Sequence, residues 1–142
     1  MKKNFTLDES HKRNITSSIS YVEELLYEIK SSLYNKKGIF FKIINDIDKS
    51  QSEKIKCKIE EIFKKIKRLK DELQLTKKEI ISSTIISSRC VAIWEDLCDV
   101  ESKKLKRYGE ISKEFSEYFD PIIKELIKDN DEILDLVKKK KQ

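Results

Sequence analysis

The chain has 142 residues, which is about the length of one folded domain. Only 2 glycines and 1 proline are present, so most hairpins, barrels and glycine-lined phosphate loops lack the turn residues that they use. Hydrophobic residues make up 38% and charged residues 40% of the chain, a balance that excludes both a disordered tail and a membrane span. We therefore expect a single all-α domain over residues 1–142.

Positive charge is concentrated in the first half of the chain. The formal net charge is +5, yet residues 1–70 hold 17 basic and 10 acidic side chains while residues 71–142 hold 14 and 16. A basic half is typical of proteins that bind nucleic acid or an anionic membrane surface. Against nucleic acid, 27 of the 31 basic residues are lysines, whereas the forked guanidinium of arginine is the usual reader of phosphates and guanine edges.

The cysteines indicate a reducing compartment. Cys57, Cys90 and Cys98 form no CxxC pair, and three is an odd number for a disulfide framework. Residues 1–5 begin like a signal peptide, but charged residues follow where its apolar region would start. We expect a cytoplasmic protein without membrane insertion.

The first helix is expected at residues 7–34. Its start has two candidate caps, Asp8 with His11 downstream, or the capping-box pair of Thr6 and Glu9. The apolar positions follow a heptad spacing, namely Ile15, Ile19, Val22, Leu26, Ile29 and Leu33.

A short apolar helix is expected next, at residues 39–47. Gly38 offers a left-handed cap for the first helix, and cations precede it. We interpret the segment as a plug at the end of a bundle, and the alternative is that Phe40 and Phe41 form an exposed patch for a partner.

The second long helix is expected at residues 52–81, with Ser52 as its N-cap. Its heptad positions are Ile55, Ile59, Ile62, Ile66, Leu69, Leu73, Thr76 and Ile80. Two matching heptads favour coiled-coil-like, antiparallel packing. The lysines of residues 54–70 surround these positions, so this helix is also the candidate for a nucleic-acid or anionic-surface contact.

The next stretch, residues 80–94, is almost free of charge and marks the most buried part of the chain. Either the chain turns near residues 82–84, or one helix runs from 52 to 108. We favour the turn, because a helix of about 57 residues would be ~85 Å long and would outreach the first helix. The third helix is then expected at residues 84–108.

The last helix is expected at residues 110–139. Asp120 and Pro121 are interpreted as an N-cap followed by proline at the first helical position, and residues 138–141 end the chain with a cationic run. The expected core positions of this helix are Ile122, Leu126, Ile133 and Val137, flanked by Ile123, Ile127 and Leu134. Four long helices of similar length predict an elongated antiparallel four-helix-type bundle with one extra short helix, and a homodimer would also satisfy such apolar faces.

Two pairs of carboxylates share the ExxxD spacing. Glu95 with Asp99, and Glu125 with Asp129, would each present two oxygen ligands on one helix face. A metal or ligand site between them is one interpretation, and surface salt bridges to neighbouring lysines and arginines are the other.

The sequence contains few of the residues that other catalytic mechanisms need. The only histidine, His11, would have to serve as the base for any cysteine nucleophile. Cys90 is expected to be a small buried hydrophobe, and Cys57 to lie on the outside of its helix. We assign no catalytic, cofactor-binding or metal-binding residue.

These observations favour a non-enzymatic helical interaction or regulatory module that binds another protein or itself through a bundle face. The alternatives are nucleic-acid or anionic-surface binding through residues 54–70, and a carboxylate-rich bundle that binds a metal or small ligand. The identity of the protein partner is not indicated by the sequence.

Overall fold

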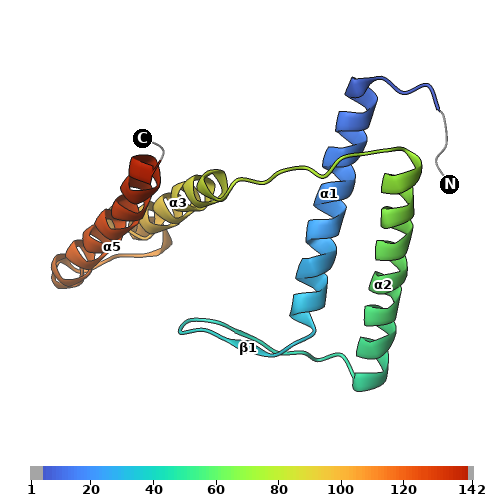
Figure 1. The fold of residues 1–142 in the computed structure, drawn as a ribbon. Helices are drawn as coiled ribbons and strands as arrows, with labels where there is room; N and C mark the ends of the chain where they lie inside the picture. The colour runs from blue at the N-terminus through green and yellow to red at the C-terminus, as the bar shows by residue number, and fades with distance from the viewer. Residues whose placement is uncertain (1–4, 141–142) are drawn as a thin grey trace. The chain divides into compact units, whose positions relative to one another are not determined.

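A computed structural model describes residues 5–140 of the chain. Helices make up 74% of it and only a small two-stranded sheet is added, so the all-α expectation is confirmed. The chain forms two compact units, Met1–Lys78 and Glu79–Gln142 (Figure 1). The signal-like start at residues 1–4 and the end of the cationic run at Lys141 lie outside the described residues. The arrangement of all long helices in one bundle stays a prediction.

In the first unit, α1 (Glu9–Ser32) begins with a capping box. The Asp8 carboxylate accepts the backbone N–H of His11 at 2.9 Å, and the His11 ring accepts the backbone N–H of Asp8 at 3.4 Å. Of the two candidate caps, Asp8 is therefore the one that is formed. The helix ends at Leu33, whose N–H bonds back to the carbonyls of its last turn.

A β-hairpin follows α1, where the sequence predicted a short helix. Strands β1 (Lys36–Lys37) and β2 (Lys42–Ile43) pair antiparallel, and the N–H of Gly38 donates to the carbonyl of Phe41 at 2.8 Å. The short-helix prediction is wrong, because the apolar run closes a hairpin instead of continuing in helical conformation. Gly38 is not left-handed either, so it does not cap α1 as expected.

Helix α2 (Lys49–Glu72) is capped by Asp48, whose carboxylate accepts the N–H of Gln51 at 2.8 Å. The expected N-cap, Ser52, lies inside the helix and is buried. The helix also ends before residue 81, because Gln74 turns left-handed at φ 54° and the N–H of Leu75 reaches the carbonyl of Lys70 at 2.9 Å. This is a Schellman end, formed without the glycine that usually marks it.

Helices α1 and α2 run antiparallel and pair in one register. The contacts are the rings of Tyr27 and Phe63 at 5.1 Å, Lys30 Nζ and Glu60 Oε1 at 3.3 Å, and Lys56 Nζ above the ring of Tyr34 at 4.7 Å. Each step of three or four residues along α1 matches an equal step back along α2. The buried side chains between them include Leu26, Leu33 and Ile59.

The second unit starts with α3 (Ser82–Asp99), which is followed by the single turn α4 (Ser102–Leu105) and the short helix η1 (Lys106–Tyr108). The break between the second and third long helices is confirmed, although it covers residues 73–81 instead of 82–84. The third helix is shorter than the expected 84–108, because it ends at Asp99. Gly109 then adopts φ 146°, a conformation that favours glycine.

Helix α5 (Lys113–Lys140) packs against α3 and closes the second unit. Its cap is the Ser112 hydroxyl, which accepts the N–H of Phe115 at 3.1 Å. The helix runs through Pro121, so the expected N-cap at Asp120 is wrong. The carboxylate of Asp120 points to α4 and accepts from Ser102.

Candidate interaction surfaces

One face of α5 carries six exposed apolar side chains. At 100° per residue their positions fall within about 80° of arc, so they form a single stripe along the helix. This α5 stripe consists of Phe115, Tyr118, Ile122, Leu126, Ile133 and Leu136, with exposed fractions from 38% to 68%. Three of these residues were expected in the core, and the structure instead leaves them on the surface.

The neighbouring face of α5 is the one that α3 covers. Ile123 is buried there, and so is Cys90 on α3. The sequence predicted Ile122 in the core and Ile123 beside it. The structure buries Ile123 instead, so the buried face is shifted by one residue from the predicted one. Apolar residues at both i and i+1 widen the hydrophobic arc of the helix, and the pattern alone does not say which edge a single partner helix covers.

A buried polar contact joins the two helices. The Asn130 side chain donates from Nδ2 to the carbonyl of Cys90 at 2.9 Å, and both residues are 5% exposed or less. Asn130 Oδ1 has no hydrogen-bond partner among the described residues. A single polar group in an apolar helix interface favours the one register in which it is satisfied.

Helix α3 also exposes apolar side chains. They are Ile85, Ile86, Val91, Ile93 and Trp94, each between 37% and 51% exposed. A pair of helices can bury only one strip of each, so the second unit presents more apolar surface than its own packing uses.

At the other end of this helix pair, Asp120 holds the start of α4. Its carboxylate accepts the Ser102 N–H at 3.0 Å and the Ser102 hydroxyl at 2.6 Å. These two hydrogen bonds, the hydroxyl first, lower the pKa of the Asp120 carboxyl below its ordinary value of 3.8. The contact fixes the start of α4 to α5, because each carboxylate oxygen accepts a hydrogen bond from Ser102.

The lysine-rich stretch of α2, residues 54–70, divides into two parts. Near its start, Lys56 Nζ lies 4.7 Å from the centroid of the Tyr34 ring. Side-chain hydrogen bonding to Tyr34, ahead of the charge of Glu53, raises the pKa of the ammonium group. Lys58 pairs with Glu61 at 3.1 Å. The later cations, Lys64, Lys65, Lys67 and Arg68, are exposed and form no ion pair within the described part of the chain.

The four carboxylates considered for a metal are all on the surface. Glu95, Asp99, Glu125 and Asp129 are exposed, and residues 5–140 contain no group of three or more potential metal ligands. Asp99 instead forms an ion pair with Lys104 at 3.4 Å. The salt-bridge interpretation is therefore the one realised at Asp99.

The histidine and cysteines have the expected surroundings. The His11 ring is engaged in the cap of α1, Cys90 is buried and Cys57 is exposed. Cys98 is half-buried, and all three thiols are free.

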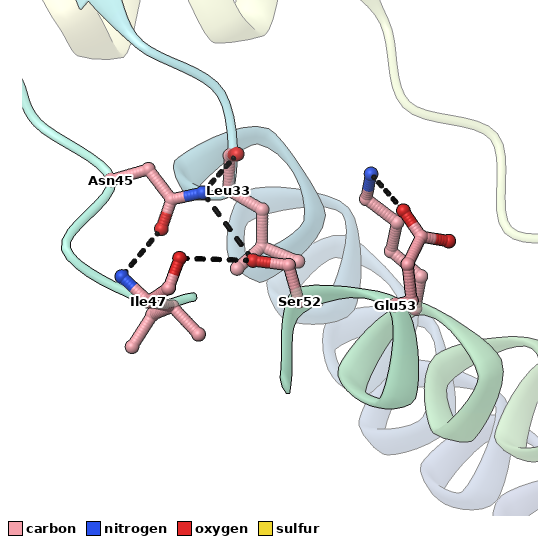
Figure 2. A network of polar contacts seen from close by, with 6 residues as sticks. Leu33, Asn45, Ile47, Ser52 and Glu53 are labelled. Atoms are coloured by element: carbon pink, nitrogen blue, oxygen red, sulfur yellow. Dashed lines mark hydrogen bonds and ion pairs between the residues drawn. The ribbon is translucent and has the colours of Figure 1, made fainter. Parts of the chain in front are cut away.

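The hairpin of the first unit is the feature that the sequence least anticipated. Ile39 and Phe40 at its tip are 97% and 99% exposed, while its base is held by Asn45 (Figure 2). Asn45 Nδ2 donates to the Leu33 carbonyl at 2.8 Å and lies 3.4 Å from the Ser52 hydroxyl, and Oδ1 accepts the Ile47 N–H at 2.9 Å. The predicted alternative of an exposed phenylalanine patch is thus confirmed in its geometry.

Comparison of the chain with protein-family models, with curated proteins and with solved structures finds no match. Across residues 5–140, no helix combines the length and the apolar character needed to cross a bilayer.

Proposed function

We propose that this chain is a non-enzymatic helical interaction module that binds another protein, or a second copy of itself, through the α5 stripe. The observation that carries the proposal is the alignment of six exposed apolar side chains on one arc of a 28-residue helix. Contiguous exposed apolar surface marks an interaction site more often than scattered exposed residues do. The partner that fits such a face is an amphipathic helix or an apolar groove.

The free thiols support a reducing location, and we place the module in the cytoplasm. The packing of α5 supports the same function, since α3 covers the neighbouring face of α5, where Ile123 is buried, and leaves the stripe available to a partner. A helix partner would extend the two-helix unit toward a coiled-coil bundle, and a second copy of this chain would make that bundle a homo-oligomer.

The test is light scattering coupled to size-exclusion chromatography, with a matched pair of variants. Ile133 lies in the α5 stripe and is 48% exposed, whereas Ile85 lies on α3, off the stripe, and is 44% exposed. Ile133→Asp is expected to abolish self-association, or the recovery of a co-purifying protein, while Ile85→Asp leaves both intact.

Circular dichroism serves as the folding control for both variants. Equal loss of association in the two folded variants would contradict the stripe as the binding surface. Retention of association in Ile133→Asp would contradict it as well.

A second candidate is anionic-surface or nucleic-acid binding by α2. It is favoured by the four exposed cations at residues 64–68 that lack ion pairs among the described residues. This function requires an affinity that falls steeply with salt and with the neutralising change Lys64→Gln/Lys65→Gln. Nucleic-acid affinity that is insensitive to both would contradict it.

A further inference from the structure

The hairpin tip carries the most exposed apolar side chains in the described part of the chain. Ile39 is 97% and Phe40 is 99% exposed, and Phe41 and Ile44 follow at 58% and 65%. An isolated exposed apolar residue needs no explanation, but four within six residues form a concentrated patch. The patch stands on a projecting loop of the first unit (Figure 1).

The hairpin holds this tip in place. Asn45 hydrogen-bonds the base through Nδ2 and Oδ1 (Figure 2). The backbone N–H of Asn45 also donates to Asn35 Oδ1 at 2.8 Å. At the tip, the Phe41 ring covers Gly38 so closely that a Cβ there would lie 2.5 Å from the ring. The exposed position of Ile39 and Phe40 is therefore built by local contacts and is not a loose end.

Three lysines lie on the two strands that lead into and out of the tip. Lys36 and Lys37 lie on β1 and Lys42 on β2, all exposed, and none forms an ion pair with another described residue. Lys37 is the cross-strand partner of Lys42. Two like charges directly opposite each other destabilise a hairpin, so the isolated chain carries a repulsion that a nearby anionic layer would relieve.

We propose that this hairpin is a membrane wedge, which inserts Ile39 and Phe40 into the boundary between the headgroups and acyl chains of an anionic bilayer. Lys36, Lys37 and Lys42 then lie at the level of the lipid phosphates. The hairpin has an apolar tip followed by a layer of cations. This order matches the bilayer interface, where the apolar acyl chains are followed outward by the anionic headgroups. The net charge of the unit has the matching sign, since residues 1–78 hold 19 basic and 12 acidic side chains.

Addition of a partner strand to the hairpin explains these residues less well. Each strand has two residues, so its edge offers few backbone groups to a peptide. That mode also leaves the side chains at the tip without a role. The proposed surface is separate from the α5 stripe, and the wedge does not depend on the function proposed for the stripe.

The first experiment is flotation of the full chain with vesicles of phosphatidylcholine, with and without about one third phosphatidylserine. Binding is expected only to the anionic vesicles and falls as salt is added. Phe40→Ser is expected to weaken binding about 10- to 100-fold. Tyr21→Ser removes an exposed aromatic side chain from α1, 62% exposed against 99% for Phe40, and is expected to have no effect.

Two double variants, each of which removes two positive charges, test the role of the hairpin lysines. Lys37→Gln/Lys42→Gln is expected to weaken vesicle binding about 25-fold, at about fivefold per lysine. Lys77→Gln/Lys78→Gln removes the same charge from the exposed segment that follows α2 and is expected to change binding by less than about threefold. The reverse order would overturn the wedge.

Insertion of the hairpin tip into the bilayer is measured by the fluorescence of a single tryptophan. In a Trp94→Phe background, the indole introduced by Phe40→Trp is expected to shift its emission to shorter wavelength and to be quenched by lipids brominated on their acyl chains. The indole introduced by Tyr21→Trp is expected to show neither effect. An absence of vesicle binding, or binding without any spectral change at position 40, would overturn the proposal, as would a Phe40→Ser variant that only loses self-association.

Discussion

Asp120 in α5 binds Ser102 with both of its carboxylate oxygens, at 3.0 Å from the backbone nitrogen and 2.6 Å from Oγ. The pair fixes the first turn of α4 to the N-terminal third of α5. It also explains why an aspartate next to a proline does not start a helix here, since its acceptor groups are used by a residue 18 positions earlier in the chain.

The Asp120 contact predicts a specific loss of stability in acid. Because the native pKa of the carboxyl is lowered below 3.8, the stabilisation is fully present above that value and is lost as the pH falls through the lowered native pKa. Asp120→Asn is expected to lower the Tm at neutral pH, and the difference from the parent chain is expected to shrink in strong acid. Thermal unfolding followed by circular dichroism across this range makes the comparison.

Ser102→Ala is the matched control for the acid effect. It removes the hydroxyl donor that contributes most to the lowered pKa and keeps the carboxylate. The difference in Tm between Ser102→Ala and Asp120→Asn is therefore expected to depend on pH much less than the difference between the parent chain and Asp120→Asn does. If the parent chain and Asp120→Asn differ in Tm by the same amount at every pH, the charge of Asp120 is not the cause of the difference.

The end of α2 predicts a stabilising substitution. A non-glycine residue in the left-handed conformation costs about 1 to 2 kcal/mol, part of which glycine recovers. Gln74→Gly is therefore expected to raise the free energy of unfolding by about 0.5 to 1 kcal/mol. If α2 continued through residue 74, the same change would lower it by about 1 kcal/mol, so urea unfolding separates the two by sign.

The buried amide between α3 and α5 predicts opposite effects for two replacements. Asn130→Leu removes an oxygen that has no partner among the described residues, and it is expected to raise the free energy of unfolding by about 1 kcal/mol. Asn130→Asp buries a charge at the same position and is expected to lower it by about 3 kcal/mol. Denaturant titration measures both, and a strongly destabilised leucine variant would show that the amide is needed for stability.

The base of the hairpin depends on Asn45. Asn45→Ala removes the side-chain hydrogen bonds to the Leu33 carbonyl and the Ile47 N–H, and it is expected to destabilise the first unit by about 2 kcal/mol. Asn14→Ala, at an exposed position of α1, is the control. Amide hydrogen exchange of residues 36–47 gives the readout, and equal exchange in the two variants would contradict the role of Asn45.

The sequence was sufficient to predict that long helices are present, because their apolar spacing spans many turns. Of the heptad positions expected in the core, Leu26, Leu33 and Ile59 are buried, whereas Val22, Ile29 and Ile62 are exposed, so the heptad pattern as a whole stays a prediction. The short apolar run near Phe40 was misassigned, since an apolar stretch of this length fits a helix or a hairpin equally well. Its outcome is decided by side-chain contacts such as Asn45 with Leu33, which join residues 12 positions apart.

The helix ends were harder to predict than the helices. Gln74 ends α2 in a conformation that glycine usually supplies, so no local signal marks the position. The α5 stripe was missed for a different reason. Ile122 and Ile123 are both apolar, and only the position of α3 determines that Ile123 is the buried one.

Each helix-to-helix hydrogen bond lies within one of the two units, and this has a consequence for how the chain folds. Lys30 meets Glu60 at a separation of 30 residues, and Asn130 meets Cys90 at a separation of 40. The entropic cost of closing a loop grows only slowly with its length, and domains generally fold as separate units. The first unit therefore has its internal partners available once Lys78 has left the ribosome, and it can fold while α5 is still being synthesised.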